Sequence, residues 1–303
     1  MVIGMPGNPP IYSATIFYIA EKQGFFTKHG AAVELKPFST SADIGRALTS
    51  NQIAGGFMGT TTAISLAGSG SPVVSIFGLE HPDYVIATTD PAVTDCMSLK
   101  GKSVAVDAPG APLDLALQAM LESCGLTESD VTAHPIGGTT QASALVSGAV
   151  KTAVAHIDTV ANVEAQGVKV RSVLSNAATQ PLAHYDALLT TKSQLQDPAA
   201  RAGWVAVTAA LHDAAVYMND PQNADAVAQV AADDVTKEPL AVTKIALPEF
   251  LKINYWPTDG NGLPQASIEF TIQQQVKAGN VQADKAPTYA DFVDSSVYAD
   301  AVK

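Results

Sequence analysis

Short apolar segments alternate with longer segments of helical spacing through about the first 190 residues, and this alternation constrains the fold most. "MVIGM", "AAVELKPF" and "IAGGFM" have the composition of strands, and after each one the apolar residues recur every three or four positions. Strands that alternate with helices of roughly 10–15 residues indicate parallel βαβ units. The sequence therefore predicts an α/β fold.

The alternation is interrupted after "YVIATTD", where "DPAVTDCMSLKG" intervenes before a second set of strands and helices. A chain of 303 residues also suggests about two domains. We expect two lobes, the first made of residues 1–88 and 190–303 and the second of residues 93–187. Two crossing strands near 85–95 and 184–192 form the expected hinge. Helical patterns follow residue 198 and are expected to pack on the first lobe.

The net charge of the chain argues against some classes of binding partner. The formal net charge is −12 and the pI is about 4.8, with no basic stripe, which argues against nucleic acid and anionic membrane surfaces. No apolar run reaches the roughly 18 residues of a membrane span. We do not expect the first residues to be a signal peptide, because they have no basic region and no cleavage site, and they begin on a strand-like segment, as a mature chain trimmed of its leader would.

Two cysteines, Cys96 and Cys124, flank the segment "KSVAVD" and the helix that follows it. A helix after a strand runs back towards the start of that strand, so the two sulfurs can meet. The sequence leaves two interpretations open, a disulfide formed in an oxidising compartment or two separate buried thiols. Their spacing is not that of a metal site, and we expect neither metal nor cofactor.

Several stretches are similar to a known family. "AEKQGFFTKHG" matches the pattern A-x-x-x-G-F-F-x-x-H-G, and "LTSNQIAGGFMG" follows it, with Asn51 and Ala54 where Gly and Asp are usual. "LKGKSVAVDAPGAPLDLALQAMLESCG" is similar to the opening of a second lobe, and "PTYADFVDSSVYADAVK" to a last segment. The chain resembles periplasmic solute-binding proteins of ABC importers, in the nitrate, taurine, aliphatic-sulfonate and thiamine-precursor group.

This resemblance implies a two-lobed, type II-like binding-protein fold that closes on a small molecule. It implies delivery of that molecule to the permease of an ABC importer, and a periplasmic or otherwise extracytoplasmic location. We expect a monomer. The resemblance does not identify the ligand, because the group has a wide ligand range.

The loops at the carboxyl ends of the strands are the expected ligand-contacting segments. Several lead into helices, and Ser41 is the expected N-cap of one of them. Each hydroxyl there can cap a helix, contact a ligand, or do both. The hydroxyl candidates for ligand binding are Ser39, Thr40, Thr60, Thr61 and Thr139.

Charged side chains in these loops indicate the ligand class. Lys and Arg are absent from residues 47–99, 103–150 and 152–168. Carboxylates and imidazoles suit a ligand with N–H donors, and two tyrosines can stack on a ring. These candidates are Tyr12, His81, Asp83, Tyr84, Asp107, His156, Asp158 and His184. Each Asp can instead be a helix cap, and each His a structural residue. The leading ligand is a small polar or aromatic nitrogenous metabolite, and the alternative is a sulfonate, nitrate or similar anion.

The sequence does not predict an enzyme. It has no Gly-x-Ser-x-Gly elbow, no Walker or Rossmann fingerprint, and no histidine near either cysteine in sequence. Two other functions stay open: an enzyme of pyrimidine synthesis or desulfination on the same fold, and the ligand-sensing domain of a receptor.

Overall fold

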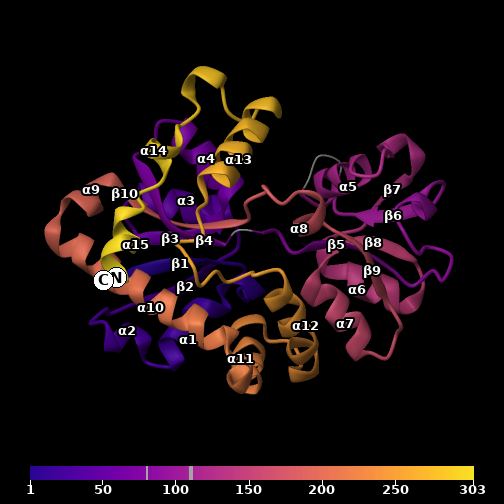
Figure 1. The fold of residues 1–303 in the computed structure, drawn as a ribbon, viewed down its shortest axis with the longest axis horizontal. Coiled ribbons are helices and arrows are strands. Elements are labelled where there is room, and N and C mark those ends of the chain that lie inside the picture. The colour runs from indigo at the N-terminus through magenta and orange to yellow at the C-terminus, as the bar shows by residue number, and fades with distance from the viewer. Residues whose placement is uncertain (80, 109–111) are drawn as a thin grey trace. The chain divides into compact units, whose positions relative to one another are not determined.

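The computed structural model describes residues 1–79, 81–108 and 112–303, apart from the side chains of Gly138 and Thr139. Two compact units make up the chain (Figure 1). The first contains Met1–Glu80, Leu182–Glu238 and Asn254–Lys303, and the second contains His81–Pro181 and Pro239–Ile253. Each unit has a five-stranded sheet with helices on it, which confirms the predicted α/β class.

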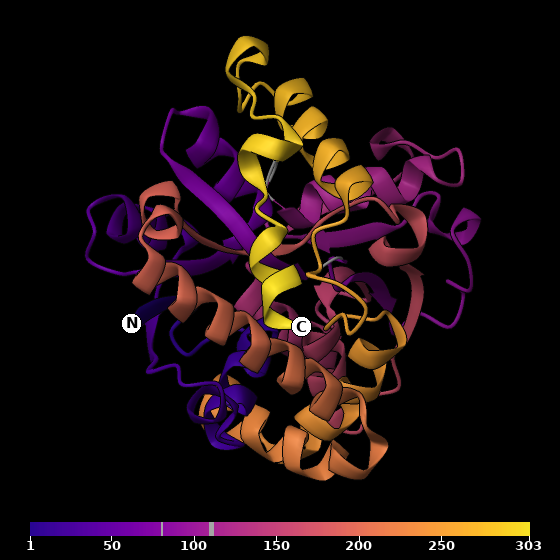
Figure 2. The same cartoon turned by 60° about the vertical axis from the view of Figure 1, so that its left-hand side comes forward.

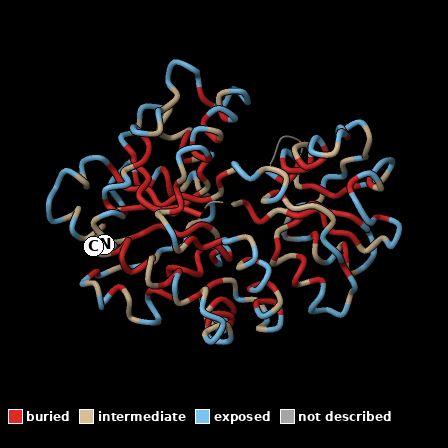
Figure 3. The backbone as a smooth tube through the Cα atoms, in the orientation of Figure 1, coloured by how far each residue is buried: buried red, intermediate tan, exposed pale blue. Residues whose placement is uncertain are grey.

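The sheet of the first unit has the order β2-β1-β3-β10-β4. Strand β1 pairs in parallel with β2 and β3, whereas β10 runs antiparallel to β3 and β4. Both β4 and β10 are buried along their whole length, as expected for strands covered on both faces (Figure 3). The strands are β1 (Val2–Pro6), β2 (Glu34–Phe38), β3 (Gly55–Gly59), β4 (Val73–Leu79) and β10 (Asp186–Thr191).

Alternate residues of β3 face opposite helical layers. Phe57 packs its ring 4.9 Å from that of Phe17 on α1 (Thr15–Lys22). Met58 joins the core that contains Ile44 of α3 (Ser41–Thr49) and Ile64 of α4 (Thr60–Gly68). This alternation follows from the two-residue period of a strand. It places α3 and α4 on one face of the sheet and α1 on the other.

The helical tail completes the first unit. Helix α13 (Gln265–Lys277) contributes Ile268 and Ile272 to the core beneath α3 and α4. On the other side, α15 (Ser296–Ala301) lies against α10 (Pro198–Asn219), where Arg201 forms an ion pair with Asp300 at 2.8 Å (Figure 2). The remaining helices of this unit are α2 (Phe25–Lys28), α9 (Lys192–Gln196), α11 (Ala224–Val230), which continues as a π-helix (Ala231–Thr236), and α14 (Tyr289–Phe292).

The sheet of the second unit has the order β7-β6-β8-β5-β9. Strand β6 pairs in parallel with β7 and β8, and β5 runs antiparallel to β8 and β9. The strands are β5 (Tyr84–Thr88), β6 (Ser103–Val106), β7 (Thr132–Pro135), β8 (Thr152–His156) and β9 (Arg171–Ser175). The helices are α5 (Pro112–Glu122), α6 (Gly138–Ser147), α7 (Ile157–Ala165), α8 (Asn176–Thr179) and α12 (Leu240–Lys252).

The units divide the chain differently from the sequence expectation. The expected first hinge strand, near 85–95, begins in β5, which belongs to the second unit because it pairs with β8 and β9. The expected second hinge strand forms β10 of the first unit. Pro239–Ile253 was expected in the first lobe, yet it belongs to the second unit because α12 packs on α7.

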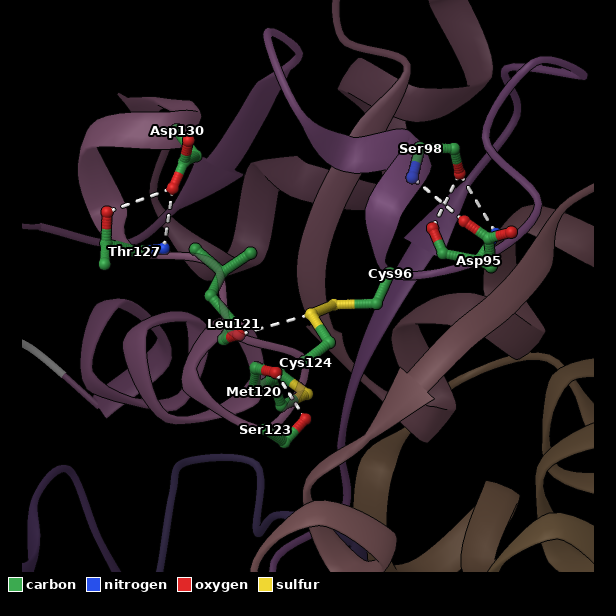
Figure 4. The surroundings of a disulfide bond; sticks show 9 residues. All are labelled: Asp95, Cys96, Ser98, Met120, Leu121, Ser123, Cys124, Thr127 and Asp130. Carbon is green, nitrogen blue, oxygen red and sulfur yellow. Dashed lines mark hydrogen bonds between the residues drawn. A yellow bond between two sulfur atoms is a disulfide. The ribbon is translucent and has the colours of Figure 1, made fainter.

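A disulfide joins Cys96 and Cys124, with their Cα atoms 6.4 Å apart (Figure 4). Cys96 precedes β6, and Cys124 follows α5, so the bond links the start of the strand to the end of the helix. Both sulfurs lie at the core of the second unit, beside Leu121 and Leu126. Of the two interpretations left open by the sequence, the structure shows the disulfide.

Candidate functional site

In the first unit, the helices α3 and α4 begin at the carboxyl-end edge of the parallel strands β2 and β3. Thr40 caps α3, because its hydroxyl accepts the N–H of Asp43 at 3.1 Å and donates to the Asp43 carboxylate at 2.6 Å. The expected cap, Ser41, is instead the first residue of the helix. Its hydroxyl accepts the N–H of Gly59 at 3.3 Å.

Three hydroxyls surround the backbone of Gly59, which is the N-cap of α4. A Cβ atom at Gly59 would lie 3.9 Å from the Ser41 hydroxyl and 4.0 Å from those of Thr61 and Thr62. Helix N-termini present N–H groups and partial positive charge. This hydroxyl cluster, defined as Ser41, Thr61 and Thr62, therefore suits a ligand oxygen.

Thr60 and His184, which were both predicted as ligand contacts, are bonded to each other. The Thr60 hydroxyl lies 2.7 Å from His184 Nδ1, and His184 Nε2 lies 2.6 Å from the carbonyl oxygen of Gly262. A carbonyl only accepts, so Nε2 carries a proton and donates it. Thr60 is fully buried and His184 is 4% exposed. The imidazole thus ties the start of α4 to the segment after α12.

A row of aromatic rings lies in the first unit. Tyr12, 2% exposed, has its ring centroid 6.0 Å from that of Trp256, and Tyr255 lies 5.0 Å from Trp256. Tyr185, next to His184, is 5.9 Å from Tyr255. Of these four residues, sequence reasoning identified only Tyr12. The adjacent aromatic residues at 255–256 are visible in the sequence. Nothing in the sequence, however, indicates that they lie beside residue 12.

In the second unit, an acid–imidazole cluster forms where β8 ends and β5 begins. His156 Nδ1 lies 3.0 Å and 3.2 Å from the two carboxylate oxygens of Asp83, which is 3% exposed. The two strands pair Tyr84 with His156, and their rings meet edge to face at 5.0 Å. The structure therefore brings together the predicted residues Tyr84 and His156 with Asp83.

Asp158, in the first turn of α7, interacts electrostatically with the same cluster. Burial of its carboxyl group raises its pKa, the His156 imidazole opposes that effect, and the Asp83 carboxylate raises the pKa further. Asp158 as a residue has intermediate exposure. We define Asp83, His156 and Asp158 as the acid–imidazole cluster. Nearby in sequence, burial lowers the pKa of His81.

The remaining predicted residues have other environments. Asp107 caps α5, since its carboxylate accepts the N–H groups of Leu113 and Asp114 at 3.3 and 3.2 Å. The Thr139 side chain lies outside the described residues. Ser39 is exposed and lines a hollow of about 570 Å³ on the first unit, which the sequence did not predict. Arg46 also lines it and forms an ion pair with Asp43.

Charges are distributed unequally along the second sheet. Its cationic side chains outside α12 precede or begin strands: Lys100 and Lys102 precede β6, Lys151 precedes β8, and Lys169 and Arg171 lie at the start of β9. Asp83, Asp107, His156 and Asp158 lie at the opposite edge, where β6 and β8 end and β5 begins. The carboxyl-end edge therefore has carboxylates and imidazole but none of those cations.

Two features are absent from the described part of the chain. Residues 1–79, 81–108 and 112–303 contain no group of three or more His, Cys, Asp or Glu side chains that can hold a metal ion. Within the same ranges, no helix combines the length and hydropathy needed to cross a bilayer.

Comparison with known proteins identifies the family. The NMT1/THI5-like family model matches residues 12–224, which is more than half of the chain. The chain therefore belongs to the NMT1/THI5-like family. No curated protein sequence is detectably similar to it.

Solved structures share the fold across nearly the whole chain. The sulfonate-binding protein SsuA of Methylobacillus flagellatus KT is 18% identical with a TM-score of 0.77, covering 100% of this chain and 93% of SsuA. The nitrate-binding protein NrtA of Synechocystis PCC 6803 is 16% identical with a TM-score of 0.73, covering 99% and 87%. DSZB, solved with biphenyl-2-sulfinic acid, is 14% identical with a TM-score of 0.71, covering 99% of both chains. At these identities the similarity shows the periplasmic-binding-protein fold.

Proposed function

We propose that this protein is an extracytoplasmic solute-binding protein that delivers a small molecule to the permease of an ABC importer. The observation that carries this proposal is the presence, in each unit, of polar side chains at the carboxyl-end edge of parallel strands, where α/β proteins bind ligands. Its similarity in fold to SsuA and NrtA, which are named as binding proteins, supports the same function.

The ligand class we favour is a small nitrogenous metabolite with N–H donors. The acid–imidazole cluster supports this class, because buried carboxylates accept N–H groups and repel anions. The lysines and arginine that precede or begin strands of the second sheet lie at its other edge. Anionic solutes normally require a cationic fork or an equivalent set of donors.

An organic anion is the second candidate, and a specific observation favours it. The hydroxyl cluster at the start of α4 offers hydroxyl donors. SsuA and NrtA are named for sulfonate and nitrate. In this alternative the solute oxygens are bound by Thr61, Thr62 and the N-terminus of α4.

A thermal-shift screen separates these candidates. Aminopyrimidines and protonated amines are compared with sulfonates, nitrate and carboxylates at equal concentrations, since a ligand that binds only the folded state raises Tm. We expect the nitrogenous compounds to raise Tm and the anions to leave it unchanged. Stabilisation by anions alone would overturn the ligand class, and stabilisation by none of them would overturn solute binding of either class.

An enzyme is the competing activity, because DSZB has the same fold and was solved with a sulfinate. The Asp83–His156 pair has the arrangement of a general base, as such pairs do in hydrolases. We propose binding without turnover. Incubating the protein with each stabilising compound and following it by mass spectrometry tests this, since chemical conversion of a tight binder would establish an enzyme.

The proposed extracytoplasmic location is supported by the Cys96–Cys124 disulfide, because such bonds persist in oxidising compartments. We also propose that the protein acts as a monomer. Sedimentation of the oxidised protein at several concentrations tests the oligomeric state.

A further inference from the structure

The hollow beside Ser39, about 570 Å³ in volume, lies at the edge of the first sheet. It is bounded by the edge strand β2, by helix α3 and by the loop after β1. Its lining includes one aromatic ring, one ion pair, two amides and a hydroxyl, which belong to Phe38, Asp43, Arg46, Asn8, Gln52 and Ser39. This combination differs from that of the hydroxyl cluster and of the acid–imidazole cluster.

The two charged side chains of the lining neutralise each other. The guanidinium of Arg46 donates to the carboxylate of Asp43, which also accepts the hydroxyl of Thr40 at 2.6 Å. Lys36 borders the hollow without lining it, and its ammonium lies 5.7 Å from the centroid of the Phe38 ring. A charged ligand would have to compete with the Arg46–Asp43 pair, whereas a neutral ligand would not.

Three uncharged polar side chains of the lining are available to a ligand. Asn8, Ser39 and Gln52 are exposed, and their side chains form no hydrogen bond to any residue that the structure describes. By contrast, the hydroxyl of Ser50 in the same lining donates to the carbonyl oxygen of Arg46 at 2.8 Å. An amide group both donates and accepts, and so does a hydroxyl. The three free groups therefore match a ligand whose own polar groups donate and accept.

The backbone is fixed at each of these three positions. Gly7 forms an isolated bridge with Phe38, so the turn that carries Asn8 is attached to the end of β2. Ser39 follows β2 directly. The N–H of Gln52 donates at 2.9 Å to a carbonyl oxygen in the last turns of α3. Groups that the fold already positions lose less freedom when a ligand binds.

We propose that this hollow binds a neutral saccharide, at a site separate from the hydroxyl cluster and the acid–imidazole cluster. Sugar hydroxyls both donate and accept, as the free side chains of the lining do. A sugar ring also has an apolar C–H face, which packs on the ring of Phe38. The hollow thus has the usual features of a small-molecule site, an apolar surface with a few convergent polar groups.

NMR titration of isotope-labelled protein tests the proposal. The probes are methyl α-glucoside, methyl β-galactoside, N-acetylglucosamine and maltose. We expect at least one of them to shift the backbone amide signals of Ser39, Ser50 and Gln52, with a Kd of about 1 mM for so open a site. Saturation of aromatic protons should transfer to the C–H protons of the bound sugar, because its ring packs on Phe38.

Variants locate the contacts. Gln52→Ala and Ser39→Ala should each weaken binding about three- to tenfold, since each loses one hydrogen bond. Gln273→Ala, at an exposed amide on α13 of the same unit, is the matched control and should leave Kd unchanged. Phe38→Leu keeps an apolar side chain against the core and should abolish the saturation transfer.

A comparison of maltose with methyl α-glucoside distinguishes two sources of the saccharide. Tighter binding of maltose supports a saccharide chain as the occupant, and equal binding supports a free sugar.

The absence of shifts with all four saccharides would overturn the proposal. Shifts at Thr61 or His156 in place of the hollow would also overturn it, because the sugar would then occupy another site. Saccharide binding that neither Gln52→Ala nor Ser39→Ala weakens would contradict the assigned contacts. Benzoate tests the anionic alternative. If benzoate alone shifts the amide signals of the hollow, and Arg46→Gln removes that shift, the hollow is an anion site and the saccharide class is wrong.

Discussion

The hydroxyl of Thr60 lies 2.7 Å from Nδ1 of His184, although the two residues are 124 positions apart in the sequence. Because Nε2 donates to Gly262, Nδ1 is the acceptor of the pair in the neutral imidazole. The imidazole is therefore occupied on both sides. In this structure it positions the start of α4, beside the hydroxyl cluster.

Thr60→Val should destabilise the protein. The substitution leaves Nδ1 of a buried imidazole without this donor, which costs about 1–3 kcal/mol. Thr61→Val is the matched control, because Thr61 is exposed in the same turn and should change stability by less than about 0.5 kcal/mol. Urea unfolding measures both. Equal stabilities for the two variants would show that the Thr60–His184 contact contributes nothing.

Thr61→Val has a second use, in ligand binding. If a solute oxygen contacts the hydroxyl cluster, this variant should weaken binding about five- to tenfold, as expected for loss of one hydrogen bond. Stability should be unchanged, so the effect is separable from folding. Calorimetric titration with the compound that raises Tm most provides the measurement. An unchanged affinity would exclude Thr61 from the site.

The sequence predicted most strands and helices because their periodicity is local. It could not predict the Thr60–His184 pair, because hydroxyl and imidazole groups come from distant segments that only the sheet brings together. The row of Tyr12, Tyr185, Tyr255 and Trp256 was missed for the same reason. Helix α12 was assigned to the wrong unit since an apolar helix face does not reveal which helix covers it.

The distribution of charge was only partly predictable from the sequence. The sequence correctly showed long segments without Lys or Arg. The strand ends place Asp83, His156 and Asp158 together. Arg46 was not considered, yet it lines the hollow beside Ser39. A residue on the second turn of a helix can reach a strand-end loop, and a list of loops omits it.

The disulfide should contribute measurably to the second unit. It joins Cys96 to Cys124, which are 28 positions apart in the sequence, and removing such a crosslink typically costs about 2–4 kcal/mol. Cys96→Ser and Cys124→Ser should each lose this amount, and the double variant should lose no more than either single one. Guanidinium unfolding, with and without reductant, checks the prediction. A wild-type protein insensitive to reductant at its unfolding midpoint would contradict it.

Lowering the pH should weaken the contacts of the Asp130 carboxylate with Thr127 and Lys100. The backbone N–H of Thr127 and then the ammonium of Lys100, 3.0 Å away, lower the pKa of this carboxyl group. A lowered pKa gives stability that is present above the unfolded value of about 3.9 and lost as pH falls through the folded value. Asp130→Asn should therefore lower Tm at neutral pH.

The difference between wild type and Asp130→Asn should vanish at the acid end of the titration, where the wild-type carboxyl group is also protonated. Asp284→Asn, at an exposed carboxylate of the first unit, serves as control and should match wild type throughout. A constant difference between wild type and Asp130→Asn at every pH would contradict the electrostatic origin.

The ligand class is tested most directly by three probes of one shape and three charges: benzamidinium, benzamide and benzoate. Their effects on Tm are measured at neutral pH for the wild type and for Asp83→Asn, which removes a buried carboxylate but keeps a side chain of similar size. We expect that benzamidinium alone raises the Tm of the wild type and that Asp83→Asn loses this shift. A rise in Tm with benzoate but not benzamidinium would contradict it.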